Sequence, residues 1–279
     1  MFKRFIALFL SLTVLLTSSN VLFANNKSAV NANGKTVYVD GVEYFVSVDE
    51  EFNTIVETVG IENQAKLILG KNGNGFITVN NSDIKGYSIN NNDKIGEVKV
   101  NELNGQNIDA KIKPLGGKNE SVHLKNINDL NSATFNEVGV QSVTAGTIII
   151  GGSLLKALLA AGLAITVAGI TVYAVESVID QVRENRQKFY KAYLRRNNVY
   201  IAPKPIPRTQ AVTRVASGGK DSDVYTYQQF RARSLVESTG YGVSQVENHR
   251  RYRLQPGTFF DHYHPIPRNG SHVFFGTPK

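Results

Sequence analysis

Histidines gather near the C-terminal end of this sequence. Of its five histidines, three lie within the last twenty residues, at His262, His264 and His272. Imidazole ionises near neutral pH and also binds transition metals, so it serves both proton transfer and metal chemistry. Side chains two residues apart on a strand point to the same face, which predicts that His262 and His264 act together.

The position of His272 depends on the turn that precedes it. A two-residue loop at 269–270 places His272 on the opposite face from His264. A three-residue loop over 268–270, with a left-handed glycine, pairs His272 with Ile266 and places it on the same face as the other two histidines. We favour the three-residue loop, which predicts a cluster of three.

The first chemistry that this cluster predicts is ribonuclease action by acid–base catalysis. His264 and His272, with His262 beside them, would act as base and acid in cleaving a phosphodiester through the ribose 2′-hydroxyl. That reaction also needs cations for the developing charge and aromatic surfaces on which bases stack. The predicted substrate-binding residues are Arg250, Arg251, Arg253, Arg268, Tyr252 and Tyr263.

Two other roles compete for the same residues. In one, His262, His264 and His272, helped by Asp261, bind a divalent metal that activates water. In the other, the histidines are packing or surface residues of a β-hairpin and carry no chemistry. The ribonuclease reading needs no cofactor, and the metal reading needs a divalent ion.

The charge of the sequence is divided unevenly along its length. Residues 1–175 hold 14 Lys+Arg and 15 Asp+Glu, whereas residues 176–279 hold 17 basic and 8 acidic residues. The second part therefore carries a net charge of +9, and 12 of the 13 arginines lie in it. Arginine suits phosphate partners, so a polyanion such as RNA is the predicted partner. The absence of cysteine excludes disulfides, thiolate metal sites and a cysteine nucleophile.

The N-terminal residues predict export. Lys3 and Arg4 precede an apolar stretch, 5–16, which is too short to span a bilayer. We predict a signal peptide over 1–24, cleaved after Ala24, and a secreted or cell-surface location for the remaining chain. Residues 25–142 are rich in Asn and Gly and contain short apolar runs. They predict an antiparallel β module that includes a hairpin at Asp40-Gly41.

Residues 143–175 predict an apolar helix or a hairpin of two helices. Residues 157–175 contain no charged side chain, and a helix of that length approaches the thickness of a bilayer. The segment is therefore predicted either to span a membrane, with its basic C-terminal flank in the cytoplasm, or to be a buried central helix. Residues 176–202 are predicted to continue as a basic helix and a linker.

The remaining residues, 203–279, predict a small α+β domain. Pro203, Pro205 and Pro207 suit an extended linker, which places the domain boundary there. A strand is predicted over 223–227 and a helix over 228–238. The whole chain is thus predicted to be α+β, with an N-terminal β module, a central apolar helix and a small C-terminal domain.

The order of these segments and the C-terminal motif resemble a family of secreted toxins from Gram-positive bacteria. The ending is similar to the His-Tyr-His … Gly-x-His-x-Phe-Phe-Gly pattern in the terminal modules of polymorphic toxins. The residues that carry the resemblance are Phe260-Asp261-His262-Tyr263-His264-Pro265 and Asn269-Gly270-Ser271-His272-Val273-Phe274-Phe275-Gly276. The resemblance implies toxicity delivered by the C-terminal part, a cognate immunity protein as partner, and a role for the three histidines.

The sequence therefore predicts an exported bacterial toxin whose basic C-terminal domain cleaves RNA. A pore-forming or membrane-active toxin built on 143–175 is one alternative. A non-enzymatic cell-surface binding protein, which the β module would suit, is the other.

Overall fold

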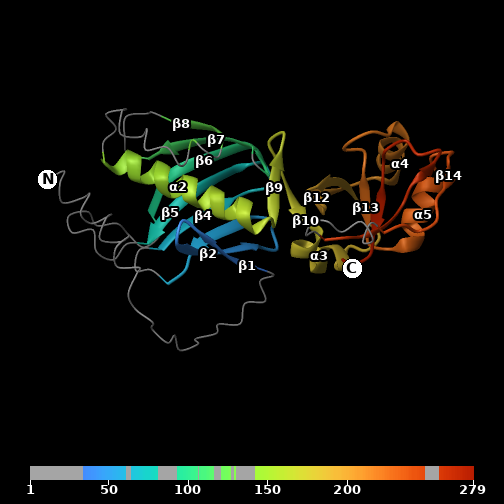
Figure 1. The fold of residues 1–279 in the computed structure, drawn as a ribbon, viewed down its shortest axis with the longest axis horizontal. Coiled ribbons are helices and arrows are strands. Elements are labelled where there is room, and N and C mark those ends of the chain that lie inside the picture. The colour runs from blue at the N-terminus through green and yellow to red at the C-terminus, as the bar shows by residue number, and fades with distance from the viewer. Residues whose placement is uncertain are drawn as a thin grey trace. The chain divides into compact units, whose positions relative to one another are not determined.

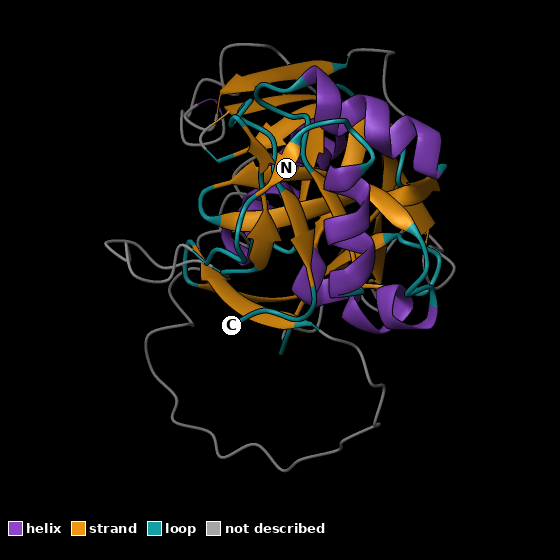
Figure 2. Cartoon of the chain, turned by 90° about the vertical axis from the view of Figure 1, so that its right-hand side faces the viewer, coloured by secondary structure: helices purple, strands orange, loops and turns teal. Residues whose placement is uncertain are grey.

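A computed structural model describes residues 34–60, 64–80, 93–105, 107–115, 121–126, 129, 142–248 and 258–279. Residues 1–24, where the signal peptide is predicted, lie outside this set. The described residues belong to one compact unit. Strands account for 47% of them and helices for 23%, and strands dominate the ribbon in Figure 2. Most strands join one mixed sheet of 15 strands. The predicted α+β class with a central apolar helix or helical hairpin is therefore wrong.

The N-terminal strands form an antiparallel succession, as their alternating apolar pattern predicts. The first hairpin turns at Asp40 and Gly41, whose φ angles of 51° and 81° give the left-handed backbone of a tight two-residue turn. The strands are β1 (Lys35–Val39), β2 (Val42–Val48), β3 (Thr54–Thr58), β4 (Gln64–Leu69), β5 (Asn74–Asn80), β6 (Asp93–Asn104), β7 (Asn107–Pro114) and β8 (Val122–Asn126).

Helix α2 (Ser142–Ala161) lies along one face of these strands (Figure 1). Its buried side chains join the main hydrophobic core with those of the sheet. The approach is close at Gly151, where a Cβ atom would lie 2.6 Å from the Ile77 side chain. The buried residues of the helix are Thr147, Ile148, Gly151, Gly152, Leu154, Leu155, Ala157, Leu158 and Ala161.

Truncation of Leu155 tests how far this helix stabilises the fold. Leu155 is fully buried, and Leu155→Ala is expected to lower the free energy of unfolding by about 2–5 kcal/mol because it removes packed atoms and leaves a cavity. Ile149 lies on the same helix but is 42% exposed, so Ile149→Ala should cost only about 0.5 kcal/mol. Urea denaturation measures both values, and equal effects would contradict the packing described above.

The apolar segment 143–175 does not form one helix. Helix α2 ends at Ala161, and Gly162, with φ 68°, turns the chain into β9 (Ala164–Val167) and β10 (Ile170–Ala174). In the part of the chain that the structure describes, no helix combines the length and apolarity needed to cross a membrane. The predicted transmembrane helix in 143–175 is therefore wrong.

The absence of charge in this segment has another cause. In β10, Val172 and Ala174 pack into one hydrophobic cluster, whereas Tyr173 packs into the main core. A strand covered on both faces contains a continuous apolar run, which periodicity alone does not distinguish from a buried helix. Burial within the protein explains the missing charges.

The predicted basic helix over 176–202 is also replaced by other elements. They are a 3₁₀ turn η4 (Val175–Val178), a short helix α3 (Ile179–Glu184), and the hairpin strands β11 (Phe189–Arg195) and β12 (Asn198–Ile206). Pro203 and Pro205 lie within β12 and not in a linker. The strand tolerates them because it pairs with β10 only at Tyr200 and Ile201, and its pairing with β11 is irregular beyond Ile201.

The C-terminal residues extend the same sheet. Strand β13 (Val224–Thr226) pairs with β11 and runs parallel to β17 (Val273–Phe275), which in turn pairs with β15 (Asp261–Tyr263). Helices α4 (Arg208–Ser217) and α5 (Gln229–Glu237) pack on these strands through a second hydrophobic cluster. A separate pair of short strands, β14 (Gly242–Val243) and β16 (Pro265–Ile266), flanks them.

Candidate metal centre

Strands β15 and β17 bring the three histidines together. Their register pairs His262 with Phe274 and Tyr263 with Val273, so His264 and His272 follow as the next opposed positions. His262, His264 and His272 thus share one face of the sheet, and Asp261 points to the other. The sequence predicts that His262 and His264 share a face, and the register of β15 with β17 places His272 on that face too.

Neither of the two predicted turns makes this arrangement. Residues 265–266 leave β15 and pair with β14, so Ile266 lies opposite Gly242 and not opposite His272. The connection from His264 to His272 is therefore a wide loop. Ser271 anchors it to helix α4, because its hydroxyl donates a hydrogen bond to the Val215 carbonyl at 3.1 Å.

The three imidazole rings form a compact, mostly buried cluster. The ring centroids lie 4.5 to 5.2 Å apart, and one ring nitrogen of each histidine lies within 4.8 Å of the others. His262 is 1% exposed and His264 is 4% exposed, whereas the His272 side chain is 16% exposed. Phe274 stacks on His272 and contacts His262, which restricts the orientation of both rings.

Each histidine has a hydrogen-bond acceptor at Nδ1. His262 Nδ1 lies 3.0 Å from the Phe260 carbonyl, and His264 Nδ1 lies 3.1 Å from the Ser271 carbonyl. His272 Nδ1 lies 2.8 Å from Oδ1 of Asp223. Carbonyl and carboxylate oxygens only accept hydrogen bonds, so Nδ1 carries the proton in each ring. In the neutral ring the lone pair is then on Nε2.

These features fit a metal ion. Metal-binding histidines are neutral, and they donate their other ring N–H to a carbonyl or carboxylate as these three do. His264 Nε2 is buried and has no hydrogen-bond partner among the described residues, which is costly for a polar atom unless a cation or donor meets it. Zinc–nitrogen bonds of about 2.0–2.1 Å place two ligands at most about 4.2 Å apart, so a bound ion would draw the rings slightly together.

The ionisation of His264 favours the same interpretation. Burial, reinforced by the neighbouring His272 and Arg268, lowers the pKa of His264 to about 4. A ring with this pKa is neutral at pH 7, as a metal ligand must be, and it is a weak proton acceptor. Acid–base catalysis by imidazole instead needs rings that ionise near neutrality. The lowered pKa of His264 therefore favours metal binding over direct proton transfer.

Glu247 adds a carboxylate to the cluster. Its backbone exchanges two hydrogen bonds of 3.0 Å with His262, and residues paired in this way project their side chains from the same face. Glu247 Oε2 lies 3.8 Å from His264 Nε2, and Oε1 accepts a hydrogen bond from Arg268. Burial alone would raise the pKa of Glu247, but Arg268 and the neighbouring histidines outweigh it and lower the pKa.

Asp223 contacts the cluster through His272. It is buried beside β13, and its Oδ1 accepts hydrogen bonds from both the backbone N and Nδ1 of His272, each at 2.8 Å. Sequence analysis missed both Asp223 and Glu247. They lie 49 and 15 residues from their histidine partners, His272 and His262, and no motif connects them.

The other predicted site residues lie apart from the cluster or outside the described chain. Asp261 pairs with Asn248 and Lys279 on the opposite face. Tyr263 is buried, stacks on Phe275 and accepts a hydrogen bond from Gln229. Arg268 is exposed at the edge of the cluster and pairs with Glu247. The predicted substrate-binding residues outside the described chain are Arg250, Arg251, Tyr252 and Arg253.

Comparison of the chain with protein-family models, with curated proteins and with solved structures gave no match.

Proposed function

We propose that this protein is a metal-dependent hydrolase whose ion is held by His262, His264 and His272. The observation that carries the proposal is the shared geometry of the three rings. Each ring donates a hydrogen bond from Nδ1 to an oxygen acceptor. One ring nitrogen from each of the three histidines lies within 4.8 Å of the other two. Three histidine ligands leave one coordination position open, as in catalytic zinc sites.

The chemistry follows from the ion and from the carboxylate beside it. A bound divalent metal lowers the pKa of a coordinated water and polarises the bond that is attacked. Glu247, whose lowered pKa keeps it ionised, lies on the same face and is suited to orient that water. Arg268 holds the Glu247 carboxylate in place and leaves its second oxygen facing His264.

The proposed substrate is a phosphodiester of RNA, and the proposed role is that of a toxin. The net charge of +9 over residues 176–279 favours a polyanion. The toxin role and the immunity partner depend on the resemblance of the C-terminal motif. Expression of residues 25–279 in a bacterial cytoplasm is expected to stop growth, and His264→Ala is expected to restore it. Growth arrest that persists in the variant would remove the histidine cluster from the toxic mechanism.

A chelator experiment tests the proposed hydrolase directly. The purified chain is incubated with single-stranded RNA and, separately, with DNA, with and without EDTA. Cleavage that EDTA abolishes and that added Zn²⁺ restores is the expected result, because the three histidines would then hold the ion that activates water. Cleavage unaffected by EDTA would instead support acid–base histidines, and no cleavage of either polymer would contradict a nuclease.

A further inference from the structure

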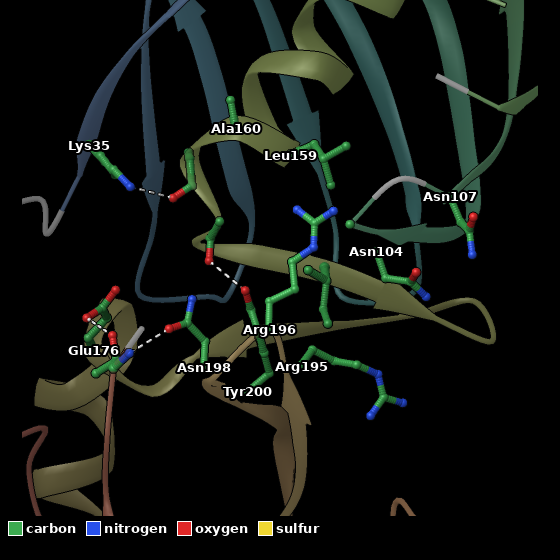
Figure 3. A pocket seen from close by; sticks show the side chains of 15 residues that line it. Lys35, Asn104, Asn107, Leu159, Ala160, Glu176, Arg195, Arg196, Asn198 and Tyr200 are labelled. Carbon is green, nitrogen blue, oxygen red and sulfur yellow. Dashed lines mark hydrogen bonds between the residues drawn. The ribbon is translucent and has the colours of Figure 1, made fainter. Parts of the chain in front are cut away.

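A large pocket that shares no lining residue with the histidine cluster lies where distant parts of the chain meet. It has a volume of about 740 Å³, within the range of small-molecule sites. Its walls are the β6–β7 turn, the C-terminal end of α2, the start of β1 and the β11–β12 turn (Figure 3). The charged and polar residues that line it include Lys35, Glu176, Arg195, Arg196 and Asn198.

Most charged groups of this pocket already have partners. Lys35 donates to the Ala161 carbonyl at the end of α2, at 3.1 Å. Glu176 accepts a hydrogen bond of 2.9 Å from the Thr258 hydroxyl. Arg195 pairs with Asp221 at 2.6 Å, and Figure 3 shows its guanidinium turned away from that of Arg196.

Arg196 differs from these residues. Within the described chain it has no hydrogen bond or ion pair, and Figure 3 shows its guanidinium extending among the lining residues. The β11–β12 turn aims the side chain, because Arg196 and Asn197 have φ angles of 48° and 61°. The guanidinium packs on Gly105, where a Cβ atom would lie only 2.7 Å from Arg196 Nε. The position of the guanidinium is thus defined, although its N–H groups have no hydrogen-bond acceptor among the described residues.

We propose that this pocket binds a small phosphorylated molecule whose phosphate is held by Arg196. The guanidinium presents paired donors that match two phosphate oxygens. Lys35 supplies a second positive charge, so the two cations outweigh the single carboxylate of Glu176 and favour a phosphate over a less charged carboxylate ligand. The volume accommodates an organic group of nucleotide size beside the phosphate. The site does not depend on the proposed hydrolase.

Calorimetric titration of the full chain with AMP tests the proposal, with inorganic phosphate and acetate as separate arms. Binding of AMP is expected, with phosphate weaker because it lacks the organic group and acetate weakest. Arg196→Asn should weaken AMP binding at least about tenfold, since it removes a charged, bidentate contact. Asparagine tolerates the left-handed backbone of this turn, so the substitution preserves the hairpin.

Two further variants complete the test. Arg196→Lys keeps the charge but loses the paired donors, so it should bind AMP more weakly than the wild type, and it replaces Arg196→Asn if that variant fails to fold. Arg233→Gln, on the exposed face of α5, is the matched control and should bind AMP normally. Three results would overturn the proposal. They are undetectable binding of AMP at millimolar concentration, AMP binding by both Arg196 variants as tight as by the wild type, and preferential binding of acetate.

Discussion

Replacing His264 with alanine is expected to abolish metal binding and hydrolysis together. The variant removes a buried ring nitrogen of the cluster and leaves only two of the three proposed ligands. Loss of a supporting residue alone typically lowers metal affinity about 10- to 100-fold, so loss of a ligand should lower it by more than about 100-fold. Metal analysis of the purified protein should show close to one zinc per wild-type chain and almost none per variant chain.

The matched control for this experiment is His123→Ala. His123 also lies on a strand and also faces a carboxylate, that of Asp109, but it is half-exposed and belongs to β8. Its removal should leave metal content and hydrolysis unchanged. If His264→Ala retains its zinc, the three histidines are not the ligands. If both variants lose zinc equally, the metal in the wild type is bound nonspecifically.

Replacing Asp223 with alanine is expected to weaken metal binding about 10- to 100-fold without removing a ligand. Asp223 accepts hydrogen bonds from both the backbone and the ring of His272, so it fixes the direction in which Nε2 points. Without it the ring can rotate or change tautomer, and fewer molecules present the lone pair to the ion. Competition with a fluorescent zinc chelator measures the affinity of each variant.

Asp223→Asn separates positioning from simple folding. Asparagine keeps an oxygen that accepts the His272 hydrogen bond but loses the negative charge, so this variant should bind zinc with an affinity between those of Asp223→Ala and the wild type. Thermal unfolding in the presence of chelator shows whether the apo forms remain folded. Identical zinc affinity in all three proteins would show that Asp223 does not position His272.

The N-terminal strands could be predicted from local sequence. Their alternating apolar residues predict an antiparallel β module, and the Asp40-Gly41 turn specifies the first hairpin without reference to the rest of the chain. The segment 157–175 could not be assigned in this way. Its lack of charge reports burial, and only the arrangement of neighbouring strands decides whether a helix or a strand is buried.

The same division holds for basic residues 176–202. The amphipathic, charged pattern of this segment predicts a helix, yet β11 and β12 form because they also pair with β13 and β10. Pairing with distant strands outweighs weak local preferences, since sheet stability comes from cross-strand contacts and burial.

For the candidate site, local sequence is enough to place two histidines on one face, because alternation along a strand is a local property. His272 joins them through the register between β15 and β17, which spans a loop that local sequence does not define. The tertiary structure also decides that Asp223 and Glu247 contact the cluster. Both depend on strand pairings between segments far apart in the chain, and those pairings are fixed by the burial of the whole sheet.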